Sequence, residues 1–289
     1  MVSPRDRIRE RPAHSYDGSK SLYAIMLAAV LLLLVAAISL GQVTTREHAT
    51  RLLQAGIATL TDVDQVIAEN REGLRQLAEA GEGPTVSFPG YPIPVEFRRA
   101  EALSGTNEQL RAAVLERSST QVYEEGLGAF DQTGQQSLGT FSTQGLIRLI
   151  VGQLSQKTHD RASLASLVLG VLAGLGGLTV ALKNHGYVRL RALGLSALGA
   201  AVVGVALVAA TRLLATNFWP DDPFGDDLAG IVTKVMEVPL RNYTVLGAAG
   251  LVLTVAGLIF QAAAERRAWD DEESWPMQPP IYADDEADA

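Results

Sequence analysis

The sequence contains no cysteine among its 289 residues. This absence excludes structural disulfides, thiolate metal sites, a catalytic thiol and a lipoprotein anchor. The chain also lacks the G-x-S-x-G, H-E-x-x-H, G-x-x-x-x-G-K and G-x-G-x-x-G patterns of hydrolases, zinc proteases and nucleotide-binding folds. We therefore expect neither an enzyme nor a bound cofactor, and an active site assembled from ordinary Ser, Asp and Glu residues stays open as the alternative.

Charged residues are scarce, at 19% of the chain against 47% hydrophobic residues, and they are absent from four apolar runs. The runs cover residues 21–41, 162–182, 192–211 and 243–264. Each is about as long as a helix needs to cross roughly 30 Å of hydrocarbon at about 1.5 Å per residue. The sequence therefore predicts an all-α integral membrane protein with four transmembrane helices. Because no ionisable residue interrupts the runs, an ion channel or a transporter is disfavoured.

Basic residues mark one side of the predicted membrane. Five of them lie in the N-terminal segment 1–20, three lie in the short loop 183–191, and two arginines follow the fourth run. Since cytoplasmic loops carry an excess of Lys and Arg, both termini and this loop are predicted to be cytoplasmic. Residues 42–161 and 212–242 are then extracytoplasmic. A cleaved signal peptide is the alternative for the first run, but no convincing small-residue cleavage site follows it.

The segment 42–161 is predicted to form an extracytoplasmic helical bundle. Apolar residues recur there at spacings of three, four and seven, including Leu53, Ile57, Ile67 and Leu74. Three or four amphipathic helices, two of them joined to membrane helices, are expected to stand upright on the membrane. This architecture loosely resembles that of the helical sensor modules of bacterial membrane receptors, a likeness of architecture alone.

A stretch rich in proline and aromatic residues, GPTVSFPGYPIPVEF at 83–97, interrupts the helical pattern. Proline removes an amide donor and disfavours helix at the preceding residue, so the stretch is predicted to be extended or turned until a short helix begins near Val95. Phe88, Tyr91 and Phe97 are candidate partner-binding residues if they form an exposed knob. The alternative is a structural connector whose rings fold back over neighbouring helices.

Small residues recur four apart within the predicted spans, and these positions are candidates for helix packing. The candidates are Gly170, Gly174, Gly177 and Gly204. Close backbone approach at such positions favours helix association, either inside one four-helix bundle or between two copies of the chain.

Two groups of side chains have the chemistry of metal ligands but no metal-binding motif. His48 and His159 flank the first and second runs, so their imidazoles are candidates for a metal site or a proton sensor, and two unrelated surface histidines are the alternative. The loop NFWPDDPFGDD holds four carboxylates, a calcium-ligand type, and an interfacial turn leading into a helix on the bilayer surface is the alternative. The carboxylates are Asp221, Asp222, Asp226 and Asp227.

The C-terminal segment 265–289 carries nine acidic residues against two arginines. This composition predicts a disordered cytoplasmic tail. Its Trp269, Trp275 and Tyr282 resemble a docking peptide, so they are candidate partner-binding residues, and a solvated tail is the alternative. The acidic balance, with a formal net charge of −8, argues against nucleic acid as a partner.

The sequence therefore favours a non-catalytic multi-pass protein of a prokaryotic plasma membrane, which acts through protein contacts of its outer helical domain and acidic tail. Its expected partners are the lipid bilayer and either another protein or a second copy of the chain in a homo-oligomer. The alternative is a membrane sensor or regulatory subunit, in which ligand or stress binding at the outer domain is relayed through the first two spans.

Overall fold

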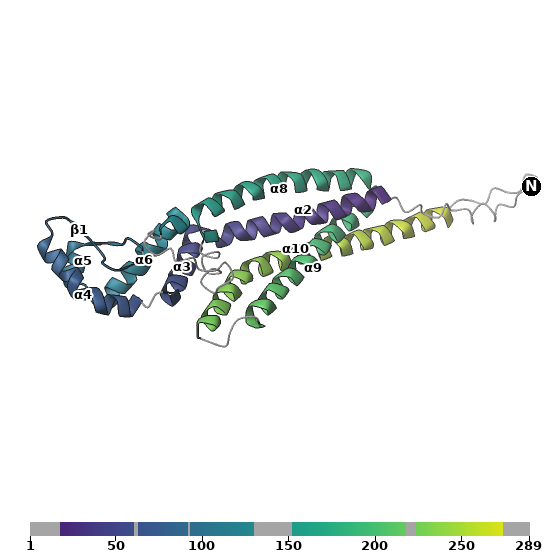
Figure 1. Cartoon of the computed structure of the whole chain (residues 1–289). Helices are drawn as coiled ribbons and strands as arrows, with labels where there is room; N and C mark the ends of the chain where they lie inside the picture. The colour runs from purple at the N-terminus through teal and green to yellow at the C-terminus, as the bar shows by residue number, and fades with distance from the viewer. Residues whose placement is uncertain (1–17, 61–62, 92, 130–151, 218–222, 274–289) are drawn as a thin grey trace, which may run out of the picture.

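The computed structural model of the chain describes residues 18–60, 63–91, 93–129, 152–217 and 223–273. Nearly all of these residues are helical, and the molecule is elongated (Figure 1). Four long helices lie along one another, and we call them the stem. A smaller group of helices with a short hairpin, formed by the described residues between 44 and 129, lies at one end of the stem, and we call it the head.

The stem consists of the four predicted apolar segments. Its helices are α2 (Gly18–Val43), α8 (Gln156–Lys183), α9 (Val188–Asn217) and α10 (Pro223–Glu273). Each contains a stretch long and apolar enough to cross a membrane. Because lipid offers no hydrogen-bonding partner, a helix satisfies the backbone amides and carbonyls within such a segment. The prediction of a mostly helical protein with four candidate membrane-spanning helices is confirmed.

Helices α9 and α10 extend beyond the apolar runs that predicted them. The sequence predicted a loop with an interfacial helix at 212–242, whereas most of this segment belongs to the two stem helices. The apolar side chains near the start of α10 explain the difference, because they pack on protein. Val235 and Val238 contact the core of the head, while Met236 and Leu240 contact a cluster in the stem. The expected interfacial helix is therefore the first part of α10.

Helix α2 packs against α8, α9 and α10. Helices α9 and α10 approach each other closely, with glycines facing the backbone of the partner helix. A Cβ atom added to Gly250 would lie 2.7 Å from the Leu198 amide nitrogen, and one added to Gly257 would lie 2.8 Å from the Arg191 amide nitrogen. Larger residues at these positions would force the helices apart, so the small residues determine the α9–α10 spacing.

The four glycines predicted to pack helices differ in their surroundings. Gly204 is buried against the Tyr243 ring of α10, and Gly177 faces a leucine of α9 at van der Waals distance. A Cβ atom built on Gly170 or Gly174 would meet nothing within 4 Å. The G-x-x-x-G pair of α8 therefore faces away from the described part of the chain.

The described residues of the head form five helical elements and one hairpin. In chain order these are α3 (Arg46–Leu60), α4 (Val63–Ala80), β1 (Thr85–Ser87), β2 (Glu96–Arg98), α5 (Arg99–Ser104), α6 (Asn107–Glu125) and the 3-10 helix η1 (Gly126–Ala129). Strands β1 and β2 are antiparallel, with Val86 opposite Phe97. The predicted helix start near Val95 is wrong, because β2 precedes α5. The hairpin escaped prediction since strands of three residues are too short to show a period-two pattern.

The core of the head is built from the predicted apolar stripe. Leu53, Ile57, Ile67 and Leu74 are each at most 2% exposed, so the apolar spacing identified residues that the structure buries. They belong to one hydrophobic cluster with Phe97, which is fully buried. The hairpin therefore contributes its inward-facing side chains to the same core as the helices.

Arg117 of α6 ties the hairpin to the helices. Its guanidinium donates to the Glu96 carbonyl at 2.6 Å and to the Glu101 carboxylate at 2.7 Å, and it lies 5.2 Å from the centre of the Phe97 ring. The hydrogen bond from Arg117 lowers the pKa of Glu101; desolvation opposes this shift, and the backbone amide of Arg98 adds to it. The planar guanidinium of arginine has several N–H donors and can make these contacts at once, whereas the ammonium group of a lysine could not.

Replacing Leu74 by alanine is expected to destabilise the head by about 2–5 kcal/mol, because the side chain is fully buried and its removal leaves a cavity. Leu77→Ala on the same helix is the matched control. Leu77 is 49% exposed, so its replacement should change stability by less than about 0.5 kcal/mol. Amide hydrogen exchange across α4 and α6 of the full-length protein measures both effects. Equal protection in the two variants would contradict the assigned core.

Replacing Arg117 by lysine is expected to cost about 1–2 kcal/mol, since one ammonium cannot reproduce the carbonyl, carboxylate and ring contacts. The partly exposed Glu101 carboxylate supplies only a small share of this. Because its pKa is depressed in the folded state, that share is present above the ordinary value of 4.5 and is lost as pH falls through the folded value.

Thermal unfolding between about pH 3 and pH 7 therefore checks the direction of this pH dependence. The difference in stability between wild type and Arg117→Lys should become smaller as the pH falls. Arg75→Lys, in an exposed pair with Glu79, should change stability by less than about 0.5 kcal/mol throughout. A gap that is the same at every pH would refute the contribution of the Arg117–Glu101 pair.

Candidate functional site

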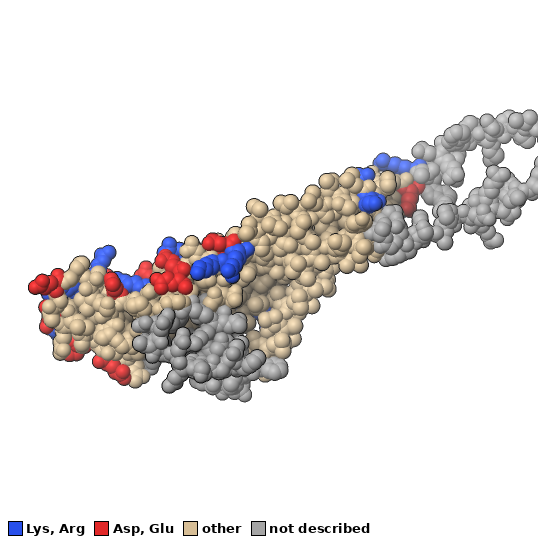
Figure 2. Space-filling view, turned by 45° about the horizontal axis from the view of Figure 1, so that its top comes forward, with Lys and Arg blue, Asp and Glu red and all other residues tan. Residues whose placement is uncertain are grey.

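A groove with a volume of about 840 Å³ lies between α3 and α6. Charged side chains gather on the head, whereas the middle of the stem carries none on the face shown in Figure 2. The charged side chains that line the groove are Arg46, Glu47, Glu108, Arg111 and Glu116. This lining carries charges of both signs beside apolar side chains, so the groove is suited to a ligand that has both charged and apolar groups.

The helical repeat explains why these side chains share one groove. On α6, the lining residues Glu108, Ala112 and Glu116 are four positions apart and therefore lie on one face. Leu110 and Val114 of the same helix are buried in the core. On α3 the lining residues also recur every fourth position. The charged groove is thus the outward face of the two helices whose apolar faces build the core.

The carboxylates of the groove differ in their pairing. Arg46 bonds Glu124 at 3.1 Å, with more than half of both side chains exposed, so this pair contributes at most about 1 kcal/mol and can be exchanged for another partner. Glu108 and Glu116 form no ion pair with any described residue. The carboxylates of Glu108 and Glu116 are therefore available to bind a cationic group of a ligand.

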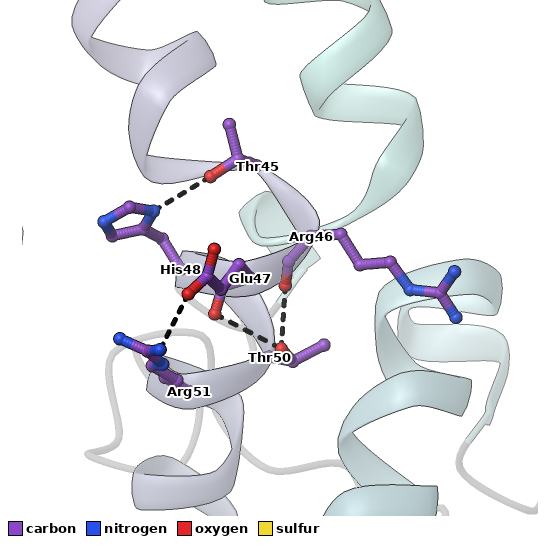
Figure 3. A network of polar contacts seen from close by, with 6 residues as sticks. All are labelled: Thr45, Arg46, Glu47, His48, Thr50 and Arg51. Atoms are coloured by element: carbon purple, nitrogen blue, oxygen red, sulfur yellow. Dashed lines mark hydrogen bonds and ion pairs between the residues drawn. The ribbon is translucent and has the colours of Figure 1, made fainter.

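The first turn of α3 holds a local network of polar contacts (Figure 3). Arg51 donates to the Glu47 carboxylate at 2.7 Å, and the Thr45 hydroxyl lies 3.0 Å from Nδ1 of His48. The Arg46 side chain points away from this network toward the neighbouring helices. Arg46 is therefore the residue of this turn that reaches across to α6.

A buried polar junction lies where α2 ends and α3 begins. Thr44 is fully buried there, and its hydroxyl donates to the Leu40 carbonyl at 2.7 Å. The Tyr123 hydroxyl of α6 donates to the Thr44 carbonyl at 3.2 Å. Nδ1 of His159, on α8, lies 3.1 Å from the Gly41 carbonyl and 3.4 Å from Thr44 Oγ1. Because a carbonyl only accepts, Nδ1 carries the hydrogen, and the junction joins α2, α6 and α8.

The Tyr123 hydroxyl is held in its protonated, donating form. Desolvation raises the pKa of Tyr123, and the nearby Asp160 carboxylate raises it further, while Arg46 acts in the opposite direction. The donor to Thr44 therefore persists throughout the physiological pH range.

The groove and the junction are built by the same two helices. Arg46, at one wall of the groove, is two residues after Thr44. Thr120, at the other wall, is three residues before Tyr123, which is nearly one helical turn. The groove and the junction therefore lie within one helical turn of each other on both α3 and α6.

The structure gives the two predicted histidines separate partners. His159 contacts the Gly41 carbonyl and Thr44, whereas His48 contacts Thr45. Among the residues that the structure describes, no group of three or more His, Asp or Glu side chains is placed to hold a metal ion. The pair therefore offers no ready-made metal site in the described part of the chain.

The aromatic residues of the proline-rich stretch are buried. Phe88, Tyr91 and Phe97 are 5%, 8% and 0% exposed, and the Phe88 ring centre lies 5.9 Å from that of Tyr91 and 5.6 Å from that of Phe97. These three aromatic side chains therefore do not form the exposed partner-binding knob that was one of the two interpretations of the sequence. The hairpin turns these rings inward, where they fill the core as the connector alternative expects.

Several predicted site residues cannot be placed in a site. Trp275, Tyr282, Asp221 and Asp222 lie outside the described residues. Trp269, Asp226 and Asp227 belong to α10, but the description does not extend to their side chains.

Sequence reasoning singled out neither the Thr44–Tyr123 contact nor the groove. Thr44 looks like an ordinary polar residue after an apolar run, and Tyr123 looks like part of an amphipathic helix. The sequence contains a weak indication of the groove, because Glu108 and Glu116 recur at a helical spacing on the side of the helix opposite the apolar stripe. Such a pattern is also typical of a solvated helix face, so the sequence alone could not distinguish the two.

Together these features define a helical protein with four candidate membrane-spanning helices, a head with a charged groove, and a buried junction between head and stem. No protein-family model matches the chain, and neither a curated protein nor a solved structure is significantly similar to it. The functional argument therefore rests on the residues of the chain itself.

Replacing Tyr123 by phenylalanine removes the donor to the buried Thr44 carbonyl, and we expect a loss of about 1 kcal/mol in the stability of the head. Because the pKa of Tyr123 is raised in the folded state, its contribution is fully present below the ordinary value of 10.0 and is lost as pH rises through the folded value. Wild type should therefore lose this contribution at alkaline pH, and the variant should not.

Thermal unfolding followed by circular dichroism from about pH 8 to pH 11 measures both effects. Tyr187→Phe, at an exposed position beyond the other end of α8, is the control and should behave as wild type. The junction would be refuted if Tyr123→Phe kept the stability and the alkaline profile of wild type.

Proposed function

We propose that this chain is a non-catalytic, multi-pass protein of the plasma membrane that acts as a relay. A partner protein binds the groove of its extracytoplasmic head, and the junction at Thr44 passes the resulting shift to α2 and α8. One observation carries this proposal: Arg46 and Thr120 line the groove and lie within three residues of Thr44 and Tyr123, which form the junction.

The charge asymmetry of the stem supports a head outside the cytoplasm. At the end opposite the head, Lys183 ends α8, Arg189 and Arg191 lie in the first turn of α9, and two arginines lie near the end of α10 (Figure 1). The head segment 42–161 is acidic by comparison, with fifteen Asp or Glu against eleven Lys or Arg. An excess of Lys and Arg marks the cytoplasmic ends of membrane helices.

The lining of the groove favours a polypeptide with basic side chains over a small apolar ligand. Five charged side chains line the groove, together with the apolar side chains of Ala112 and Leu115. Glu108 and Glu116 can each bind a Lys or Arg of a partner, since no described residue pairs with them. Complementary charges of this kind speed encounter and select the partner.

The relay follows from the contrast between exposed and buried contacts. The exposed pair between Arg46 and Glu124 is cheap to rearrange, at up to about 1 kcal/mol, so binding in the groove can move α3 relative to α6. The junction is buried, and a polar group left unpaired there costs about 1–3 kcal/mol. A shift of α3 and α6 should therefore move α2 and α8 and leave the junction intact. The size of this effect depends on how much more tightly the partner binds the shifted state than the original one.

The absence of cysteine provides a direct test of groove and orientation. A Glu116→Cys variant is treated, in intact cells, with a membrane-impermeant thiol reagent that carries a photo-crosslinker. We expect labelling, because position 116 is exposed in the groove of an external head, and a crosslinked adduct after illumination. An adduct with another protein or with a second copy of the chain supports the proposal equally.

Two matched variants distinguish the ways in which this proposal can fail. Glu72→Cys is exposed on α4 outside the groove, so it should be labelled without giving the adduct. Lys183→Cys lies at the opposite end of the stem and should not be labelled. Labelling of Lys183→Cys but not of Glu116→Cys would show that the head is cytoplasmic. Binding in the groove would be refuted if Glu72→Cys gave the same adduct or if Glu116→Cys gave none.

A further inference from the structure

An apolar cavity with a volume of about 290 Å³ lies between α2, α9 and α10 at the head end of the stem. Its walls include Ala36, Leu40, Leu207 and Met236. Ala36, Leu40 and Leu207 are also exposed on the apolar surface of the stem. The cavity is therefore open to the side on which a membrane would supply hydrocarbon chains.

A second cavity, of about 600 Å³, lies between α3 and α10 and is markedly basic. Arg51, Lys234 and Arg241 line it together with His48, and Glu237 is the only carboxylate among the described residues that line it. Lys234 and Arg241 are seven positions apart on α10, which is about two turns, so they project from the same face of the helix.

The two cavities adjoin each other. Val43 and Val235 line both, so an apolar wall is shared between the basic cavity and the apolar one. The apolar cavity lies along the stem, and the basic cavity lies next to α3 of the head. This order, apolar along the span and basic at its end, matches the order of acyl chain and headgroup in one leaflet of a bilayer.

Two of the three Lys and Arg side chains that line the basic cavity have no ion pair within the described chain. Neither Lys234 nor Arg241 forms an ion pair or a hydrogen bond with a described side chain, whereas Arg51 is paired with Glu47. Exposed basic side chains beside a membrane span attract anionic headgroups. Lys234 and Arg241 are therefore available to bind an anionic group from outside the described chain.

We propose that these adjoining cavities bind one anionic phospholipid, with an acyl chain in the apolar cavity and its phosphate between Lys234 and Arg241. The lipid fits both cavities at once. A soluble anion would leave the apolar cavity unused, and an apolar partner helix would leave the cations unpaired. Because α3 and α10 form the walls, the bound headgroup also braces the head against the stem next to Thr44. This inference does not depend on the function proposed for the groove.

Native mass spectrometry of the full-length protein tests this lipid site. The protein is extracted with equal amounts of phosphatidylglycerol, which is anionic, and phosphatidylcholine, which is zwitterionic. We expect wild type to retain phosphatidylglycerol preferentially. Removing both cations in a Lys234→Gln/Arg241→Gln variant should weaken this retention by about 25-fold, or about fivefold for each cation.

The control removes two exposed cations that also lie at the head end of a stem helix but line neither cavity. A Lys157→Gln/Arg161→Gln variant of α8 should retain phosphatidylglycerol as wild type does. Equal retention of the two lipids by wild type, or undiminished retention by the Lys234/Arg241 variant, would overturn the proposal. If the double variant fails to fold, Lys234→Gln alone gives the fivefold test.

A substitution in the apolar cavity tests the acyl chain separately from the headgroup. Ala36→Phe leaves every charge in place and fills part of the cavity from an exposed position, so it should also lower phosphatidylglycerol retention. Glycerol phosphate, the headgroup without chains, should not displace the lipid at equal concentration. Unchanged retention in Ala36→Phe, or displacement by glycerol phosphate, would refute a lipid as the occupant.

Discussion

The buried contacts of Thr44 hold the head on the stem. Every polar atom that is removed from water at this position needs a partner, because an unpaired one costs about 1–3 kcal/mol. Leu40, Tyr123 and His159 supply these partners from three helices, so hydrogen bonds at Thr44 connect the head to α2 and α8. The surrounding ion pairs are exposed and weak. The junction is therefore the place where contacts from α2, α6 and α8 meet between head and stem.

A second constraint acts within the stem, where hydrocarbon replaces water. Hydroxyl groups there satisfy themselves on their own helix, as Ser39, Ser166 and Thr254 do by donating to the carbonyl four residues earlier. These hydroxyl groups are therefore not available to donate to a neighbouring helix. Close packing of small residues is then the main contribution to helix association. An exception lies at the head end, where Asn242 of α10 donates to Ser39 at 3.0 Å and to Gln42 at 2.8 Å. A second exception lies farther along the stem, where the Tyr243 hydroxyl of α10 donates to the Leu32 carbonyl of α2 at 2.8 Å.

Local patterns predicted the elements whose causes are local. The uncharged runs became stem helices because each residue in them favours hydrocarbon independently of its neighbours, and Leu53, Ile57, Ile67 and Leu74 are buried because their spacing matches the helical repeat. The limits of α10 could not be predicted in the same way. Pro239 lies inside this helix although proline disfavours a helix interior. The packing of neighbouring side chains such as Val235 against the head offsets that local cost.

The chain by itself determined the number of candidate spans, the stripes that build the core of the head, and the scarcity of charge along the stem, because periodicity and transfer free energy are properties of short segments. Only the tertiary structure decided that Tyr123 and His159, 79 and 115 positions from Thr44, meet at one buried residue. It also decided that Lys234 and Arg51 share a cavity. The physical reason is that these contacts depend on which helix faces pack together, and a local pattern shows that a face is apolar or charged without showing which other face will cover it.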